Sequence, residues 1–373
     1  MKVNVNKEII LKELGNAAKF RAKEGINFTF LSTVEKGLSI KSTDGTVYNS
    51  DIIPLEVVGE EDLIVAHSII EPGTALITPI VEDVIRKVPS EQLTLTVSSG
   101  KITITAEGFD ATVSLSEGDF PNAPQGEVIS EISSPFSFFD DLLKYSGVAS
   151  AVSDSRPVLQ GINLKGNGED FRSVTTDSYR LSSYKVPSSI NFNNVTVPTK
   201  AFATVLDTMD KDEKIRFMHI GNYVKLVQGD HEVYIKLLDG NYPDVEKICS
   251  LPATHKQVRV KTREILTAID RAMLFAKNDS KKTSKIIRAS FENNSMKIFS
   301  QNEQGSIDTS IQCISVSEGI PTEVYAYQGG FLTDAIKAHH SDEVILNIGT
   351  NAQALFITSD KEGVIQLVLP IKI

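Results

Sequence analysis

The stretch Glu117–Asn122, EGDFPN, returns later in the chain as Asp239–Asp244, DGNYPD. Each copy reads acid, Gly, Asp or Asn, aromatic, Pro, and Asn or Asp, and the two glycines lie 122 positions apart in 373 residues. Self-similarity at a fixed spacing is the signature of a structural unit that has been copied. Because this spacing is about a third of the chain length, it predicts three units in series.

A β-hairpin pattern extends the repeat upstream of both linkers. Two alternating strands around a Gly turn span residues 100–115 and 221–237, and a third such hairpin at residues 354–370 closes the chain. Hairpin and linker recur together in the same order, which predicts three domains. The alternative is three unrelated β-rich domains that share this turn chemistry by chance. The predicted domains are residues 1–122, 123–246 and 247–373.

Each predicted domain holds two stretches with helical periodicity between runs of short alternating strands. Proline marks the ends of one of them, since Pro79 follows Thr78 at its start and Pro89 stops it. The elements do not alternate as βαβ units, so the sequence predicts an α+β fold with antiparallel sheets. The predicted helices span residues 6–20, 78–88, 134–145, 199–209, 262–276 and 330–339.

The net charge of −10 argues against broad adhesion to nucleic acid. Basic residues nevertheless gather on and just after the predicted helices, while acidic residues are dense elsewhere, as in residues 207–213. One interpretation is a segregated charge distribution with a single positive face. The alternative is a set of ordinary solvated helix faces with local ion pairs, since these helices also carry acids such as Glu8 and Glu82.

The sequence offers no recognisable catalytic motif. It contains neither a Gly-rich phosphate-binding loop nor a nucleophile elbow, and the adjacent His339 and His340 lie on different faces of a predicted helix. We therefore predict no catalytic residues, no metal, no cofactor, and a protein that works by its shape and surface. Cys249 and Cys313 fit no ligand or redox spacing, and neither an apolar run of membrane length nor a leader pattern is found, which predicts a cytoplasmic protein.

Four motifs carry a resemblance to a known family. The middle domain reads RPVLQGI at residues 156–162 and TTDSYRL at 175–181, the linker DGNYPD follows at 239–244, and the last residues are LVLPIKI. In this order and spacing they resemble the bacterial DNA polymerase III β subunit, the sliding clamp. That family reads Arg-x-x-Leu-x-Gly, Ala-Thr-Asp-Gly-His-Arg-Leu and Asp-Gly-x-Phe/Tyr-Pro-Asp, and ends in apolar-Pro-apolar-basic-apolar. The resemblance covers the whole chain and is strongest in the second and third domains.

The resemblance implies a DNA replication processivity factor without catalytic activity. Clamp subunits have three similar domains of the DNA-clamp type and pair head to tail as a homodimer, with paired helices lining a central hole and sheets outside. Such a ring encircles duplex DNA of any sequence, in the cytoplasm at the nucleoid. It tethers the polymerase III catalytic subunit, the clamp loader and other replication or repair proteins that bear clamp-binding peptides. The residues that would face DNA are Arg21, Lys23, Arg86, Lys87, Arg156, Lys200 and Lys337.

The resemblance also implies a ring interface and a peptide-binding pocket between the second and third domains. In the ring, Leu274 and Phe275 would meet the edge strand near residues 111–115 of a partner. Without the resemblance, the apolar residues of the pocket floor would be assigned to the core. The pocket residues that the resemblance implies are Leu159, Thr176, Ser178, Tyr179, Arg180, Leu181, Pro243, Lys247 and Ile248, with Leu367, Val368, Leu369, Pro370, Ile371, Lys372 and Ile373 from the chain end.

Two departures from the family pattern affect this prediction. Ser178-Tyr179 stands where the family has Gly-His, which predicts a narrower or more hydrogen-bonding pocket mouth. Pro157-Val158 stands where relatives often carry aromatic residues, which weakens any role in stacking on DNA. Two other hypotheses stay open: a repeat-built adaptor that binds peptides without encircling DNA, and an enzyme with a site assembled from Thr176, Asp177, Tyr179 and Arg180.

Overall fold

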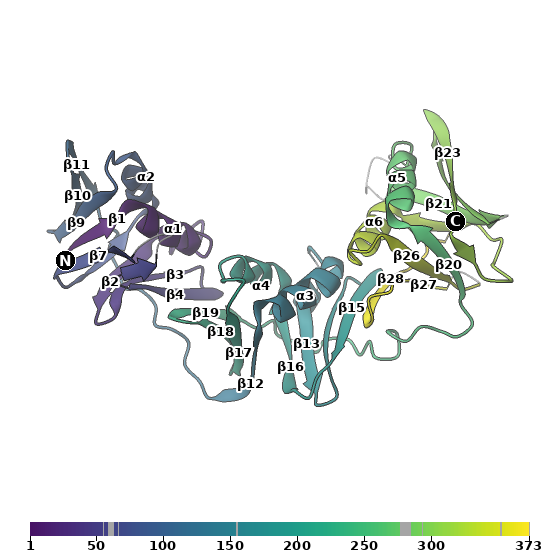
Figure 1. Cartoon of the computed structure of the whole chain (residues 1–373), viewed down its shortest axis with the longest axis horizontal. Helices are drawn as coiled ribbons and strands as arrows, with labels where there is room; N and C mark the ends of the chain where they lie inside the picture. The colour runs from purple at the N-terminus through teal and green to yellow at the C-terminus, as the bar shows by residue number, and fades with distance from the viewer. Residues whose placement is uncertain are drawn as a thin grey trace. The chain divides into compact units, whose positions relative to one another are not determined.

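The computed structural model describes residues 1–54, 56–58, 63–65, 67–153, 156–276, 285–292, 294–350 and 353–372. Contacts between residues divide the chain into two compact units, Met1–Phe136 with Ala201–Leu237, and Ser137–Lys200 with Leu238–Ile373. Each unit is built on antiparallel sheets that carry helices (Figure 1). The predicted α+β architecture with antiparallel sheets is therefore confirmed.

The first unit contains two large sheets and two helices that pack against each other, α1 (Lys7–Ala18) and α2 (Pro79–Lys87). The five-stranded sheet runs in the order β11 (Phe109–Ser114), β10 (Lys101–Ala106), β9 (Gln92–Ser98), β1 (Lys2–Asn6) and β7 (His67–Glu71). The eight-stranded sheet runs β12 (Val128–Pro135), β17 (Lys214–Ile220), β18 (Tyr223–Gln228), β19 (His231–Lys236), β4 (Val47–Pro54), β3 (Gly37–Thr43), β2 (Thr29–Val34) and β8 (Thr74–Ile77). A short pair, β5 (Glu56–Val58) and β6 (Leu63–Val65), and helix α4 (Thr199–Leu206) complete the set.

The second unit also contains two sheets, with the helices α5 (Thr262–Ala272) and α6 (Gly329–Lys337) in contact with each other (Figure 1). The nine-stranded sheet runs β16 (Asn191–Pro198), β13 (Gly161–Asn167), β14 (Asp170–Thr176), β15 (Arg180–Pro187), β28 (Val364–Val368), β27 (Leu355–Thr358), β26 (Glu343–Ile348), β20 (Lys256–Lys261) and β24 (Ser315–Val316). The four-stranded sheet runs β23 (Gly305–Gln312), β22 (Ser295–Asn302), β21 (Ile286–Glu292) and β25 (Tyr325–Gln328). The remaining helices are α3 (Phe136–Ser146) and the short 3-10 turns η1 (Gly147–Ala149) and η2 (Pro157–Gln160).

The six predicted helices are confirmed; four lie wholly within their predicted ranges, whereas α3 ends one residue later and α6 begins one residue earlier than predicted. Helix α1 begins after Asn6, whose side chain accepts hydrogen bonds from the backbone N–H groups of Glu8 and Ile9. Helix α5 ends four residues before its predicted end, since Leu274 and Phe275 donate to carbonyls three residues back rather than four. Apolar periodicity continues through such tightened turns, so it overestimates the length of a helix.

A regular order of elements links the six helices to the sheets. The third strand after each helix is β4, β11, β15, β19, β23 and β28 in turn, and four of these six strands pair with each other: β4 pairs with β19, and β15 pairs with β28. Both pairings join strands from different predicted domains, which is why the contacts resolve two units. The two remaining third strands, β11 and β23, are the end strands of their sheets. The division into three domains stays a prediction.

The repeated linkers are each held by their aromatic residue. Phe120 stacks on Phe30 with 5.4 Å between ring centroids and also contacts the rings of Phe28 and Tyr48. Tyr242 packs against two apolar clusters of the second unit, one with Leu159 and one with Leu181. The recurring aromatic-Pro sequence therefore fastens an irregular segment to a sheet.

Large apolar cores explain why these elements assemble. In the first unit, Ile10, Leu14 and Ile85 from the two helices are buried among strand residues such as Leu38 and Leu95. In the second unit, α5 and α6 bury residues such as Ile269 and Ile336 in the same way. No helix among the described residues has both the length and the apolar character that a membrane crossing needs.

One buried histidine ties the end of α6 to a strand. His339 is 1% exposed; its Nε2 donates to the Ile357 carbonyl at 3.0 Å, and its Nδ1 lies 3.1 Å from the Ser359 hydroxyl. Nδ1 then accepts from that hydroxyl, which describes a neutral ring with both nitrogens bonded. Burial lowers the pKa of His339 to about 4.

We expect the protein to lose stability as the pH falls from about 6.5 to 4, partly through His339. The folded-state pKa lies below the unfolded value, so the unfolded chain binds an extra proton in this window and stability present above pH 6.5 is lost. Urea unfolding of the wild type and of His339→Gln at several pH values measures the difference. The variant should be less stable at pH 7, and its stability should fall less steeply, by up to about 1.4 kcal/mol per pH unit. Equal slopes would contradict the prediction.

Candidate functional site

The turn between β14 and β15 positions the most unusual group of polar side chains. The Thr176 hydroxyl donates to the Arg180 carbonyl at 2.7 Å, and Asp177 Oδ1 accepts from the backbone N–H groups of Tyr179 and Arg180. Between them, Ser178 has a left-handed backbone with a φ of +77°. These hydrogen bonds from side chains satisfy backbone groups that no neighbouring strand pairs in the turn, and so hold the turn in one conformation.

The turn forms one wall of a depression with a volume of about 370 Å³. The segment that follows the second repeated linker forms another wall, and strands β27 and β28 contribute side chains from the adjoining part of the same sheet. Its buried lining is mostly apolar, with Leu181, Phe356 and Leu367, and its exposed lining mixes apolar and charged side chains, as in sites that recognise short peptides. The lining residues are Arg156, Thr176, Ser178, Tyr179, Arg180, Leu181, Pro243, Val245, Lys247, Ile248, Ser250, Pro252, Ala354, Phe356, Leu367 and Leu369.

Strand alternation decides which residues of the chain end reach this depression. Leu367 and Leu369 line it, while Val368 between them is fully buried in the core on the other face. The Leu369 N–H donates to the Tyr179 carbonyl at 3.0 Å, and the Ile371 N–H donates to the Ala326 carbonyl at 2.8 Å. The chain end therefore runs along the turn first and then leaves it for strand β25.

The structure brings together ten of the predicted pocket residues: Thr176, Ser178, Tyr179, Arg180, Leu181, Pro243, Lys247, Ile248, Leu367 and Leu369. Leu159 is not among them, because it is fully buried beside Ala151 and Val158. Val368, Pro370, Ile371 and Lys372 also lie outside the lining, and Ile373 lies outside the described residues.

Six lining residues are not among the pocket residues predicted from the sequence. The hairpin pattern could have found Phe356 and Ala354, because Phe356 pairs with Leu367 and shares its face of the sheet. Val245 comes directly after the repeated linker and is buried beside Leu181. Arg156, which the family resemblance placed against DNA, is exposed and lines the depression, where it donates to the Ser178 hydroxyl at 2.5 Å. The remaining two are Ser250 and Pro252.

The charged groups that line the depression are all cations: Arg156, Arg180 and Lys247. Burial raises the pKa of the Cys249 thiol nearby, so this thiol stays protonated at neutral pH. The depression holds no carboxylate–hydroxyl pair suited to general acid–base chemistry among its lining residues. It is equipped to bind an apolar ligand with some negative charge.

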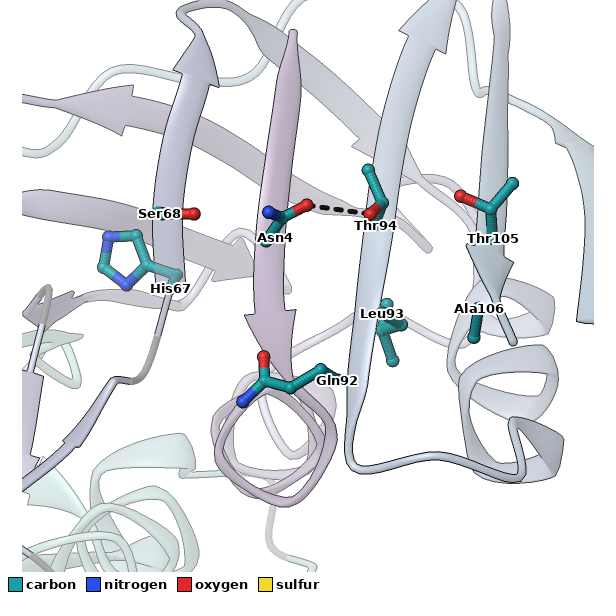
Figure 2. A pocket seen from close by; sticks show the side chains of 8 residues that line it. All are labelled: Asn4, His67, Ser68, Gln92, Leu93, Thr94, Thr105 and Ala106. Atoms are coloured by element: carbon teal, nitrogen blue, oxygen red, sulfur yellow. Dashed lines mark hydrogen bonds between the residues drawn. The ribbon is translucent and has the colours of Figure 1, made fainter.

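A second depression, of about 380 Å³, lies on the five-stranded sheet of the first unit (Figure 2). The Thr94 hydroxyl donates to Asn4 Oδ1 at 2.8 Å, and the His67 ring points away from both (Figure 2). Burial lowers the pKa of His67, so its ring is neutral at physiological pH. Among the described residues, no group of three or more His, Cys, Asp or Glu side chains is placed to hold a metal ion.

The predicted DNA-facing residues fall into two classes. Lys23, Arg86, Lys87, Lys200 and Lys337 are exposed. Arg21 is not, because its side chain is 9% exposed and its Nη1 lies 2.5 Å from Glu82 Oε1, which is itself 7% exposed. The buried ion pair between the end of α1 and α2 contradicts the expectation that Arg21 contacts DNA.

The predicted ring interface lies at a sheet edge. Leu274 is 65% exposed, and Phe275 packs over Gly305 at the start of the end strand β23. A side chain at Gly305 would come within 2.8 Å of the Phe275 ring, so the glycine lets the ring cover the strand. Alternate residues of β11, the other end strand, are exposed.

Comparisons with known proteins agree with this architecture. A family model described as DNA polymerase III beta subunit, central domain, matches residues 135–244. The beta sliding clamp of Bacillus subtilis is 26% identical over 356 residues, which covers 91% of this chain and 89% of the relative. That of Staphylococcus epidermidis is 25% identical over 348 residues, with 91% and 89% covered.

Solved structures match the fold over the full chain. The DNA polymerase sliding clamp from Bacillus subtilis superposes with a TM-score of 0.90 at 21% identity, covering 100% of this chain and 99% of that one. A Pseudomonas aeruginosa sliding clamp bound to griselimycin gives a TM-score of 0.88 at 20% identity, with both chains fully covered (100%).

Replacing Arg21 should destabilise the fold, unlike replacing its exposed neighbours. In Arg21→Met the Glu82 carboxylate stays buried without its cation, which typically costs about 3 kcal/mol or more. Arg86→Met, on the exposed side of α2, should change stability by less than about 0.5 kcal/mol. Urea unfolding measures both. A stability change in Arg21→Met as small as that in Arg86→Met would show that the buried pair has no structural role.

Proposed function

Because this chain belongs to the bacterial DNA polymerase III β-subunit family, the sliding clamps, we propose that it is a DNA replication processivity factor. In this role the protein closes into a ring around duplex DNA and tethers a replicative polymerase. It performs no chemistry itself, acts with the chromosomal DNA in the cytoplasm, and requires no cofactor. Its activity consists of topological retention on DNA combined with peptide binding.

The observation that carries the ring proposal is the pair of open edges at β11 and β23. Within the chain, β4, the third strand after α1, pairs with β19, the third strand after α4. Likewise β15, the third strand after α3, pairs with β28, the third strand after α6. Each pair therefore joins a strand that follows an odd-numbered helix to one that follows an even-numbered helix. The two strands left over are β23, the third strand after α5, and β11, the third strand after α2. By the same rule β23 of one copy would pair with β11 of a second copy, and the two copies would be arranged head to tail. Two copies then close two such junctions, and exposed Leu274 and half-buried Phe275 flank the joint.

Exposed lysines and arginines on the helices support the contact with DNA. Lys23, Arg86, Lys87, Lys200 and Lys337 would meet phosphates, and such contacts carry no sequence information and weaken as salt rises. Arg21 is left out of this set because of its buried pair with Glu82. Retention by a closed ring does not need tight contacts, so weak ones leave the protein able to slide.

The depression beside the Thr176–Arg180 turn would receive peptides from the polymerase, the clamp loader and other replication or repair proteins. Its apolar lining residues, among them Leu181, Ile248 and Leu369, suit leucine or phenylalanine anchors. The cations at its rim suit an acidic group near those anchors. An adaptor that binds peptides without encircling DNA is the second candidate, and the same depression supports it.

Topological retention tests the ring directly. The protein is loaded with a clamp loader onto nicked circular DNA, separated from free protein by gel filtration, and followed after the DNA is linearised. We expect retention on circles and loss from linear ends. Leu274→Asp should abolish retention by opening the ring, whereas Val128→Asp, an equally apolar exposed site on β12, should not. Equal behaviour of the wild type on circular and linear DNA would favour the adaptor.

Truncation of the chain end tests the pocket. Deleting residues 369–373 removes Leu369, which is 42% exposed at the rim, and should weaken peptide binding by about 2 kcal/mol, or roughly 30-fold. Lys372→Ala alone should leave affinity unchanged, because Lys372 is exposed and outside the lining. Calorimetry with a polymerase-derived peptide measures the loss, and sedimentation should show an intact dimer. Normal peptide affinity in the truncated protein would mean that the peptide binds elsewhere.

A further inference from the structure

Arg180 lines the depression, yet its guanidinium is engaged from three sides. Its Nε donates to Asp177 Oδ2 at 2.9 Å, its Nη1 donates to Asp334 Oδ2 at 2.6 Å, and its carbon lies 4.3 Å from the centre of the Phe331 ring. Asp334 and Phe331 belong to helix α6, whereas Asp177 belongs to the turn that carries the pocket mouth. Arg180 therefore connects the turn to the helix.

The positive charge of Arg180 is already more than compensated. Two carboxylates face one guanidinium, and the Arg180 and Asp177 side chains are only 12% and 13% exposed, while Asp334 is 50% exposed. A ligand carboxylate that approached Arg180 would meet both aspartates and would be repelled at least as strongly as attracted. Lys247, exposed at the rim, is the better receptor for negative charge on a ligand.

The same contacts reach both walls of the depression. Asp177 binds Arg180 with one carboxylate oxygen and the backbone N–H groups of Tyr179 and Arg180 with the other. The Tyr179 carbonyl in turn accepts from the Leu369 N–H, so the chain end follows the position of the turn. Any movement of Arg180 relative to α6 would shift Tyr179 and Leu369 together.

We propose that Asp334, supported by Phe331, is a positioning residue for the peptide pocket. It contacts no ligand; it fixes Arg180, and through Arg180 the Thr176–Arg180 turn and the chain end, at the separation that ligand anchors require. This inference rests on the proposed peptide-binding function. Of the three cations that line the pocket, it assigns Arg180 to building the site and Lys247 to receiving ligand charge.

The alternative role for Asp334 is competition, in which it occupies Arg180 until a ligand carboxylate displaces it. The two roles predict opposite results. A positioning residue supports the binding of every peptide, so its loss weakens acidic and neutral ligands by the same factor. A competitor hinders acidic ligands, so its loss strengthens the binding of those ligands alone.

The experiment uses the full chain and two synthetic peptides that are identical except for one Asp or Asn beside leucine and phenylalanine anchors. Fluorescence anisotropy gives the Kd of each peptide for the wild type, Asp334→Asn, Asp334→Glu and the matched control Asp342→Asn, an exposed acid just beyond α6. We expect Asp334→Asn to weaken both peptides by about tenfold, Asp334→Glu to restore most of the affinity, and Asp342→Asn to change neither. Lys247→Met should weaken the Asp peptide alone.

Two further variants separate positioning from a general loss of structure. Arg180→Lys combined with Asp334→Asn should bind no more weakly than Arg180→Lys alone, because both act through one contact. Phe331→Leu should give a smaller loss that is again equal for the two peptides. Thermal unfolding should show all variants folded, since Asp334 is half exposed.

Three results would overturn the positioning role. Tighter binding of the Asp peptide by Asp334→Asn would establish competition, and unchanged binding of both peptides would make the ion pair a bystander. Full additivity with Arg180→Lys would place the effect of Asp334 elsewhere. If the wild type bound neither peptide, the proposed pocket itself would fail, and that outcome is distinct because no variant is needed to see it.

Discussion

The structure depends on one pairing rule between antiparallel strands. The third strand after one helix pairs edge to edge with the third strand after another, as in Glu232 opposite Ser50 and Arg180 opposite Val368. Each pairing buries two edges that would otherwise expose unpaired backbone groups, which is a strong reason for the joints to form. The rule leaves β11 and β23 as end strands of their sheets, and the proposed ring would pair them between two copies.

The candidate pocket is a consequence of the same joint. Because β15 pairs with β28, the turn before β15 and the residues after β28 lie side by side, and Tyr179 and Leu369 are hydrogen bonded across the gap. The pocket therefore uses segments nearly 190 positions apart in the sequence. Its walls are joined by backbone hydrogen bonds, which position side chains more firmly than a contact between two loops would.

The sequence predicted the helices, the antiparallel sheets and ten residues that the structure brings together in one depression, because periodicity and motif order report local structure and family resemblance. The resemblance placed Leu159 and Val368 in the pocket, whereas both are buried in the core, since a motif gives identity but not the direction of a side chain. Arg21 shows a different limit. A basic residue after a helix looks like a solvent-exposed charge until a distant partner, here Glu82, is known. Likewise, nothing local to Arg180 indicates that Asp334 binds it.

Ser178 shows how this chain departs from its family within a shared geometry. The turn requires a left-handed residue, a position where the family has glycine and where a side chain costs on the order of 1 kcal/mol. Ser178 adopts this conformation despite its side chain, and its hydroxyl accepts a 2.5 Å hydrogen bond from Arg156 that glycine could not accept. The bond draws Arg156 to the pocket mouth, beside Tyr179, which is 67% exposed. Where the family has Gly-His, Ser-Tyr thus makes the backbone less flexible and orders a cation at the rim of the pocket. Selectivity among peptides would arise at this rim rather than among the buried apolar residues.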